Sequence, residues 1–170
     1  LNVSSALGER DKTVSGVTRL ATPEAFGIYL AAAYAFRLHQ KYPDLRLELT
    51  PESQRVQLAN RDADLAVMLN RPPQGPIIAR KLVDYRIGLY ASRRYLDEQG
   101  DICDAASLPR HPFASYIDER IDIPELRYLR EVSEDAASIF RSTSIAAQHE
   151  AVAGGLGVGM LHVFAAEKDP

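Results

Sequence analysis

Two short runs of strand-forming residues each lead directly into the same tripeptide, Thr-Pro-Glu. The first run, residues 17–21, precedes the tripeptide at 22–24, and the second run, residues 45–49, precedes the tripeptide at 50–52. Threonine is a favoured N-cap and proline is favoured at the first helical position, so each tripeptide predicts a strand that passes into a helix. A nearly continuous apolar run at 64–69 predicts a third strand, central and buried.

The first predicted helix, from Pro23 to about Tyr42, is apolar on every face between Ala25 and Phe36. A surface helix usually shows one apolar stripe, so both sides of this helix need cover, and the apolar stretch is too short to span a bilayer. One side is expected to pack on its own sheet, with the candidates Phe26, Leu30 and Ala33. The other side is expected to contact a partner subunit, unless the helix is central to the core of a monomer; its residues are Ile28, Ala31 and Ala35.

The rest of the chain also alternates between predicted strands and helices. Ser92, Asp104 and Ser142 are the expected N-caps of three helical segments, and Gly100 is expected to end the first of them. The segment after Ser142 is expected to stay helical to Ala153. The other predicted elements are a short helix at 51–60 and strands at 85–91, 111–117, 126–132, 139–141 and 158–161.

If strands 17–21 and 45–49 lie parallel, both helix starts emerge at the carboxyl edge of one sheet. Ligands bind at that edge in open α/β sheets, and the free N–H groups of a helix start favour an anion. Thr22, Thr50 and the hydroxyl run at 142–144 are therefore candidate ligand contacts. The alternative interpretation is that these hydroxyl groups only cap their helices.

Four charged residues flank these candidate contacts. Glu24 and Glu52 would repel an anionic ligand, so an amine-bearing or neutral ligand remains open. Arg19 and Arg141 could supply a countercharge, but solvated side chains or structural ion pairs are the simpler interpretation.

Composition narrows the class of protein further. Hydrophobic residues make up 46% and charged residues 25% of the 170 positions, as in ordinary soluble globular proteins. The net charge of -3 gives the chain no overall basic field for nucleic acid. Cys103 is the single cysteine, which excludes an internal disulfide and fits a reducing, cytoplasmic compartment. The chain starts at Leu1 without a basic and apolar leader, so we expect a piece of a longer polypeptide or a processed product.

The sequence offers little for catalysis, metal binding or cofactor binding. The four histidines have no metal-ligand spacing, and Cys103 has no histidine nearby in sequence. The glycine-rich run G-G-L-G-V-G, from Gly154, follows a predicted helix and leads into a strand, which reverses the order of a dinucleotide-binding motif. We expect these glycines to stop the helix and to permit tight packing. Neither a cofactor nor a metal is predicted, and the chain is not expected to be an enzyme.

Five segments spread along the chain share their order and spacing with a known family. They are S-G-V-T-R-L-A-T-P-E-A-F-G, Q-K-Y-P-D-L-R-L-E-L, R-D-A-D-L-A-V-M-L-N-R-P, R-K-L-V-D-Y-R-I-G-L-Y-A-S-R-R-Y-L and A-V-A-G-G-L-G-V-G-M-L. Together they resemble the effector-binding (regulatory) domain of LysR-type transcriptional regulators, over roughly residues 16–170. The resemblance implies an α/β, two-lobed Rossmann-like domain similar to type 2 periplasmic binding proteins, with its C-terminal part absent.

The resemblance also implies a division of the chain. Residues 1–15 would be the end of a linker region, and 16–75 would form regulatory lobe I, incomplete without the C-terminal segment. Residues 76–83 would be a hinge, 84–161 regulatory lobe II, and 162–170 a return crossover toward lobe I.

In that family an effector cleft lies between the lobes. Carried onto this chain, the resemblance implies dimerisation through the first helix, as a homodimer or homotetramer, and contact with DNA only through an absent helix-turn-helix domain, with no membrane contact. The expected function is effector sensing and dimerisation within a transcriptional regulator; the alternative is a solute-binding protein of a transport system. The residues expected to bind a small-molecule effector are Thr22, Pro23, Thr50, Ser53, Ser142, Thr143 and Ser144.

Overall fold

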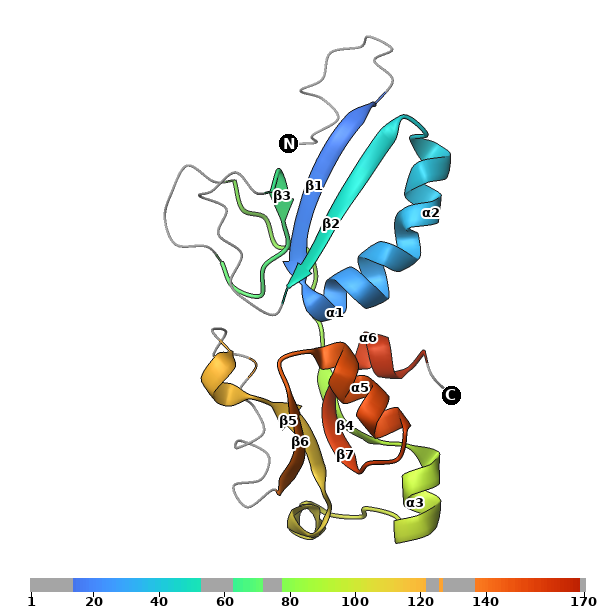
Figure 1. The fold of residues 1–170 in the computed structure, drawn as a ribbon, viewed down its shortest axis with the longest axis vertical. Coiled ribbons are helices and arrows are strands. Elements are labelled where there is room, and N and C mark those ends of the chain that lie inside the picture. Colours follow the sequence, from blue (N-terminus) through green and yellow to red (C-terminus); the bar gives the residue numbers. More distant parts are fainter. Residues whose placement is uncertain (1–13, 53–62, 72–77, 122–125, 127–136, 169–170) are drawn as a thin grey trace.

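The structure, a computed structural model, describes residues 14–52, 63–71, 78–121, 126 and 137–168. They form two lobes stacked along the longest axis of the molecule, each built on its own β-sheet (Figure 1). We call the part with the first sheet lobe I and the part with the second sheet lobe II. The predicted fold class, a two-lobed α/β domain, is confirmed, whereas the predicted bounds of linker, lobes, hinge and crossover stay a prediction.

Lobe I contains a three-stranded parallel sheet in the order β2-β1-β3. Strand β1 (Gly16–Pro23) pairs with β2 (Leu45–Glu52) along its whole length, from Gly16 opposite Leu45 to Pro23 opposite Glu52. The parallel arrangement that was considered from the sequence is therefore observed. Both strands end side by side at the edge of the sheet that faces lobe II (Figure 1).

The prediction of a central, buried strand at 64–69 is wrong. Strand β3 consists only of Leu65–Ala66, and the Leu65 side chain is 59% exposed. Within the described part of the chain, β3 pairs with β1 alone, so it is an edge of this sheet. Residues 66–69 are half-buried, so the apolar run is only partly covered.

One helical path follows β1. It consists of α1 (Glu24–Phe26), the π-helical segment η2 (Gly27–Ala31) and α2 (Ala32–Lys41). Ala25 and Gly27 are buried at its start, but α2 has no buried residue. The interpretation of a helix central to a monomer's core therefore fits its first turn and fails for α2.

The two sides of this helical path differ less than the sequence pattern suggests. Phe26 and Leu30 are half-buried, but Ala33 is exposed, so the expected packing of Ala33 on the sheet is wrong. The predicted partner face is open, with Ile28 and Ala35 exposed and Ala31 half-buried. The α2 surface also exposes two large aromatic side chains, Tyr34 at 56% and Phe36 at 69%.

The threonine and proline of both Thr-Pro-Glu tripeptides belong to strands. Pairing of β1 with β2 extends to Pro23 and Glu52, which keeps Thr22 and Thr50 in extended backbone. The helical path after β1 starts at Glu24, with Pro23 in the N-cap position and no capping hydrogen bond from its side chain. The predicted N-cap roles of both threonines are wrong, because the ladder between the strands outlasts them. The helix predicted at 51–60 begins with two strand residues, and its remainder lies outside the described residues.

Lobe II contains a four-stranded mixed sheet in the order β4-β7-β5-β6. Strand β4 is antiparallel to β7, whereas β5 is parallel to both β6 and β7. The strands are β4 (Ile87–Ala91), β5 (Phe113–Tyr116), β6 (Ser138–Ser142) and β7 (Val158–His162). The strand predicted at 126–132 lies outside the described residues, apart from Leu126.

The helical segments of lobe II largely follow the predicted caps. Ser92 accepts a hydrogen bond from Tyr95 N at the start of α3, and Asp104 accepts one from Ser107 N at the start of η4. Gly100 ends α3 with a φ of 85°, the left-handed region that glycine tolerates. The segments are α3 (Arg93–Gln99), the 3-10 helices η4 (Ala105–Arg110) and η5 (Asp118–Arg120), α5 (Ile145–Ala153) and α6 (Val163–Ala166).

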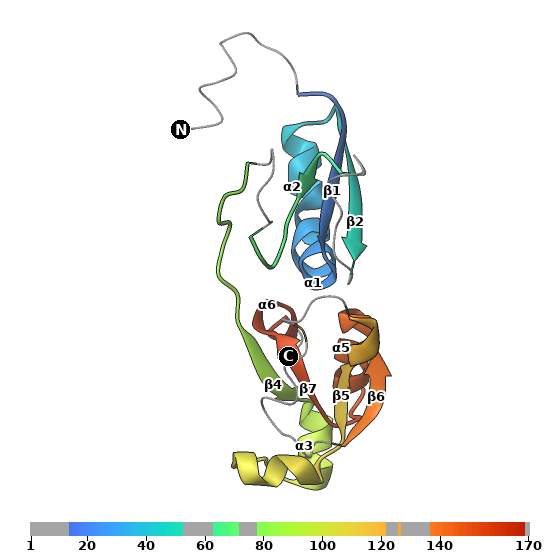
Figure 2. The ribbon, with the colours of Figure 1, turned by 90° about the vertical axis from the view of Figure 1, so that its left-hand side faces the viewer.

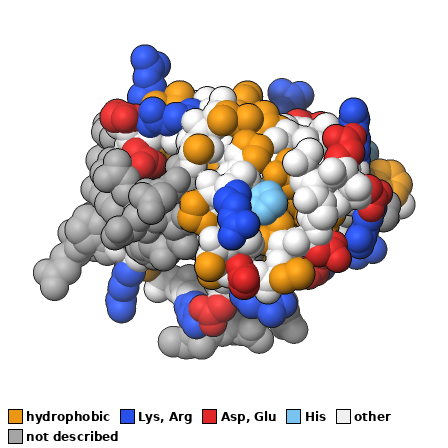
Figure 3. All heavy atoms as spheres, turned by 90° about the horizontal axis from the view of Figure 1, so that it is seen from below, with side chains coloured by type: hydrophobic (Ala, Val, Ile, Leu, Met, Phe, Trp, Pro, Cys, Tyr) orange, Lys and Arg blue, Asp and Glu red, His pale blue; other side chains and the backbone are white. Residues whose placement is uncertain are grey.

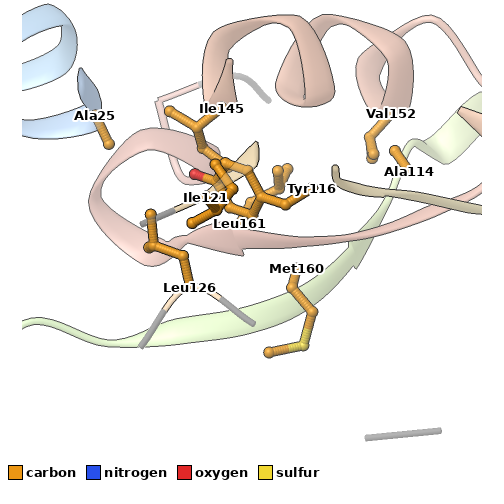
Figure 4. Close-up of a cluster of buried hydrophobic side chains, with 9 residues drawn as sticks. All are labelled: Ala25, Ala114, Tyr116, Ile121, Leu126, Ile145, Val152, Met160 and Leu161. Atoms are coloured by element: carbon orange, nitrogen blue, oxygen red, sulfur yellow. The ribbon is translucent and has the colours of Figure 1, made fainter. Parts of the chain in front are cut away.

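The buried residues of the main hydrophobic cluster belong to lobe II, except for Ala25 of lobe I. Ala25 extends from α1 into this cluster beside Ile145 of α5 (Figure 4). The glycine run packs as expected, because a methyl group built on Gly157 would lie 2.1 Å from Pro112 O and one built on Gly159 would lie 2.6 Å from Val152 Cγ2. The other buried members of the cluster are Ala114, Tyr116, Ile121, Leu126, Val152, Met160 and Leu161.

The segment before β4 runs along one side of the molecule from lobe I into lobe II (Figure 2). Where it enters lobe II it meets the end of β7, since Val163 N donates a hydrogen bond to Arg86 O. After β7 the chain turns into α6, which lies at the end of lobe II nearest lobe I (Figure 1). The two lobes are therefore joined by covalent chain on one side and by packed side chains around α1 and α5.

Candidate functional site

The start of α5 accepts a side chain from lobe I and forms hydrogen bonds between the lobes. Ser144 is its N-cap, with Oγ accepting from Ala147 N at 3.2 Å. Ser142 was expected to be this cap, and that prediction is wrong. Strand β6 extends through Ser142, and the Ser142 hydroxyl instead accepts a hydrogen bond from Ser144 N at 3.0 Å. The run of three hydroxyl residues thus spans the strand end and the helix cap.

Glu24 of lobe I reaches this helix start. Its Oε1 accepts a hydrogen bond from Ser144 Oγ at 2.6 Å, and its Oε2 accepts one from Ile145 N at 2.8 Å. The sequence indicated only that Glu24 would repel an anionic ligand. A local sequence pattern cannot predict this contact, because the partners of Glu24 are 120 and 121 positions away in the chain.

Thr22 lies behind this interface and does not line an open cleft. Its side chain is fully buried, at 0% exposed. A methyl group built on Gly27 would lie 2.5 Å from Thr22 Oγ1 and 2.7 Å from Pro51 Cβ, so Thr22 sits against both residues. Among the residues with described positions, Thr22 Oγ1 has no hydrogen-bond partner. Any contact between Thr22 and a ligand would therefore need a different arrangement of these neighbours.

The other predicted ligand-binding residues are placed unevenly. Pro23 is half-buried beside Glu24, and Thr50 is exposed in β2 opposite Ala21. Thr143 is exposed at the end of β6. Ser53 lies outside the described residues. The structure therefore brings the ends of β1 and β2 together and places the start of α1 against the start of α5.

Two further contacts between the lobes were not found from the sequence. The ring of Tyr29, in η2, lies 5.4 Å from the ring of His149, in α5, measured between centroids. Lys168 Nζ donates a hydrogen bond to Tyr29 O. His149 is 4% exposed, so its side chain is packed inside the protein.

A small hollow lies within lobe II beside α5. Its volume is about 10 Å³, which is room for roughly one water molecule. Gln148, which is 1% exposed, donates from Nε2 to Ser142 O at 3.3 Å. The hollow is too small for a metabolite; its lining residues are Ala114, Ser115, Tyr116, Asp118, Leu126, Gln148 and Met160.

The two arginines considered as countercharges form ion pairs. Arg19 Nε lies 3.0 Å from Glu48 Oε2, and Arg141 Nη2 lies 2.5 Å from Glu119 Oε2. These side chains are 42% to 71% exposed, so each pair contributes little to stability. The structural interpretation of both arginines is confirmed.

His162 is a buried histidine whose titration is shifted. It ends β7, is 5% exposed, and its Nδ1 has no hydrogen-bond partner among the positions that the structure describes. Its ring lies 5.3 Å from each of the rings of Tyr85 and Phe164. Burial lowers the pKa of His162 from 6.5 to about 4, so the ring is neutral at pH 7.

The end of lobe II that faces away from lobe I has a mixed surface. Among the described residues visible there, Lys and Arg side chains are interspersed with Asp and Glu and with hydrophobic patches (Figure 3). Within the described ranges, no group of three or more His, Cys, Asp or Glu side chains could hold a metal ion. No helix in that same part of the chain is long and apolar enough to cross a membrane.

The sequence matches the family described as the LysR substrate binding domain over residues 11–170. The chain belongs to this family. The LysR resemblance inferred from the five segments is thereby confirmed. The fold is accordingly that of LysR regulatory domains, which resembles type 2 periplasmic binding proteins.

Two relatives that match are named as transcriptional regulators. An HTH-type transcriptional regulator of Xanthomonas campestris pv. campestris is 29% identical over 108 residues, which are 64% of this chain and 29% of that protein. The HTH-type transcriptional regulator CrgA of Neisseria meningitidis serogroup C is 29% identical over 96 residues, which are 56% of this chain and 32% of CrgA. The matches thus span about a third of the length of these curated relatives.

A solved structure agrees with this LysR fold. The regulatory domain of CrgA, a LysR-type transcriptional regulator from Neisseria meningitidis, superposes with a TM-score of 0.77 at 21% sequence identity. The superposition covers 91% of this chain and 76% of that chain. At this identity the similarity establishes the fold, and the chemistry of the site depends on the residues of this chain.

Proposed function

We propose that this chain is the effector-sensing and dimerising domain of a LysR-type transcriptional regulator that acts in the cytoplasm. The observation that carries the proposal is the family match over residues 11–170. The placement of two strand ends and two helix starts at the boundary between the lobes supports a ligand site there. The chain matches only about a third of the length of these relatives. DNA binding and transcriptional control by the whole protein are therefore part of what we propose.

The effector site lies between the lobes, at the start of α5 and the carboxyl ends of β1 and β2. Exposed hydroxyl groups at Thr50 and Thr143 are the first contacts available to a small molecule. Ser142 and Ser144 follow, since both already serve the helix start. The full proposed set is Thr22, Pro23, Thr50, Ser53, Ser142, Thr143 and Ser144.

The effector acts by preferring one arrangement of the lobes. A ligand shifts an equilibrium only by its differential affinity for the two states. In a regulator, a change in the spacing of the lobes would be passed to the helix-turn-helix domains that bind DNA. The names of both curated relatives favour this role over that of a transport solute-binding protein.

The dimer forms through the exposed face of the helical path in lobe I. Ile28 and Ala35 are exposed, and Tyr34 and Phe36 enlarge the apolar surface beside them. Sedimentation at several protein concentrations should show a homodimer or homotetramer. Ala35→Asp should shift it toward monomer, whereas Asp97→Asn, on the exposed surface of lobe II, should not.

A thermal-shift screen of small metabolites on the purified chain tests the effector site. A ligand that stabilises the wild-type chain should stabilise Thr143→Val less, because the hydroxyl group is lost from the proposed site. Thr18→Val, near the other end of β1 and four residues before Thr22, is the control. A ligand that binds Thr143→Val and Thr50→Val as tightly as the wild-type chain would refute this location.

A further inference from the structure

We propose that the Glu24 carboxylate is a latch between the lobes, occupying from within the chain the anion-binding position at the start of α5. Both of its oxygens accept hydrogen bonds from the first residues of that helix, Ser144 and Ile145. The donor–acceptor distances are 2.6 and 2.8 Å. One side chain of lobe I therefore satisfies two donors of lobe II.

The start of α5 is suited to a carboxylate for a physical reason. The first backbone N–H groups of a helix have no partner within the helix, and the helix dipole makes that end positive. α5 has nine residues, which make more than two helical turns, so its start carries the positive end of such a dipole. Hydrogen bonds to an ionised acceptor are roughly twice as strong as neutral ones. Glu24 is half-buried at this position, which limits screening of the contact by solvent.

The surrounding packing aims Glu24 at this helix. Pro23 ends β1 with a φ of -56°, and Glu24 follows as the first helical residue. Ala25 is 2% exposed and packs in the lobe II cluster. The ring contact of Tyr29 with His149 holds the next turn of lobe I against α5. The latch is therefore one of several contacts at this boundary, and it is the one that places a carboxylate on the helix start.

The latch restricts which effector groups can reach the start of α5. A ligand carboxylate or phosphate aimed at Ile145 N must first displace Glu24, whereas an amine or a neutral group need not. This consequence for the effector rests on the proposed function, but the latch itself does not. Its test can therefore be made without any effector.

The first test compares thermal denaturation of the wild-type chain, Glu24→Gln and Glu150→Gln. Glu150 is exposed on the same helix, so its variant is the matched isosteric control. Glutamine leaves only one neutral acceptor at the helix start, and we expect Glu24→Gln to lower Tm by about 3 to 6 °C. Glu150→Gln should change Tm by about 1 °C or less. Equal effects of the two substitutions would overturn the latch.

The second test asks whether a free carboxylate can replace the missing one. Glu24→Ala should be stabilised by about 200 mM sodium acetate more than by sodium chloride of equal ionic strength, with a Tm difference of about 2 °C or more. The wild-type chain should show no such difference, because its site is filled. Glu24→Ala combined with Ser144→Ala should lose most of the response.

Nuclear magnetic resonance of the Ile145 amide gives a readout that does not depend on overall stability. Its signal should move on acetate addition in Glu24→Ala and stay fixed in the wild-type chain. If Glu24→Ala does not fold, the same amide in Glu24→Gln should differ in chemical shift from the wild-type signal. Acetate responses that are equal in the wild-type chain and Glu24→Ala, or absent from both, would overturn the proposal.

Discussion

The two lobes differ in how much of their own apolar surface they bury. In lobe II, β5 and β7 are buried at every position. In lobe I, β1 buries only Ala21 and Thr22, and α2 buries no residue. Lobe I gains buried surface where Ala25 enters the lobe II cluster. Among the described residues, those of lobe II therefore form the larger buried core. Those of lobe I depend more on contacts outside their own lobe for the burial of their apolar side chains.

The largest expected effect comes from one pair of phenylalanines, one in each lobe. Phe113 in β5 is 0% exposed, whereas Phe36 in α2 is 69% exposed. Phe113→Ala should lower the free energy of unfolding by about 3 to 5 kcal/mol, because it leaves a cavity in a closed core. In one isolated copy of the chain, where its ring is exposed, Phe36→Ala should change it by about 0.5 kcal/mol or less; in the proposed dimer the loss should be larger. Urea denaturation followed by circular dichroism, at one fixed protein concentration, measures both.

The same two phenylalanine substitutions can also contradict this difference in burial between the lobes. A loss from Phe36→Ala as large as that from Phe113→Ala would mean that α2 is covered in solution. Repeating the measurement over a range of protein concentrations would then separate cover by a second copy of the chain from cover within one copy.

Two glycines with positive φ sharpen the same contrast. Gly157 in lobe II has a φ of 154°, and a methyl group built on it would lie 2.1 Å from Pro112 O. Gly16 in lobe I has a φ of 102° but nothing within 4 Å of such a group. Gly157→Ala should cost about 3 kcal/mol or more, from overpacking added to backbone strain. Gly16→Ala should cost only the strain, about 1 to 2 kcal/mol. Thermal denaturation of both variants checks the difference.

Local signals in the sequence were sufficient for most elements of lobe II. Ser92, Asp104 and Gly100 mark helix ends because capping chemistry depends on residues next to each other in the chain. The parallel pairing of β1 and β2, the condition under which their ends were expected at one edge of the sheet, is also observed. The junctions themselves were misassigned, since a ladder between two distant segments decided where the strands end.

The candidate site was less accessible to sequence reasoning. The start of α5 was predicted as a candidate ligand contact, and its cap was predicted at Ser142 but lies at Ser144. The Glu24 contact depends on how the lobes are packed, which no local pattern encodes. The same limit applies to β3, whose apolar run predicted burial but whose neighbours leave Leu65 exposed.

A pH-dependent loss of stability should come from His162, where β7 leaves the lobe II sheet. Burial lowers its pKa from 6.5 to about 4, so the unfolded chain takes up a proton at a higher pH than the folded chain does. Stability should therefore fall as pH drops from about 6.5 to about 4, by at most roughly 3 kcal/mol. His162→Phe, which keeps an aromatic ring, should remove this part of the pH profile. His39→Phe, at an exposed position of α2, should leave the profile unchanged.

The smallest expected effect distinguishes a capping threonine from a packed one. An N-cap threonine replaced by a residue without a hydroxyl group costs about 1 kcal/mol, as the sequence pattern of Thr22 first suggested. In the structure Thr22 Oγ1 is fully buried and, among the described residues, has no hydrogen-bond partner. Removing a buried, unpaired polar group at constant shape is neutral or favourable. Thr22→Val should therefore leave the free energy of unfolding unchanged or raise it by up to about 1 kcal/mol. Ser144→Ala removes an observed cap and a partner of Glu24, so it should lower the free energy of unfolding in the same urea experiment. A comparable loss from Thr22→Val would show that the Thr22 hydroxyl group has a hydrogen-bond partner.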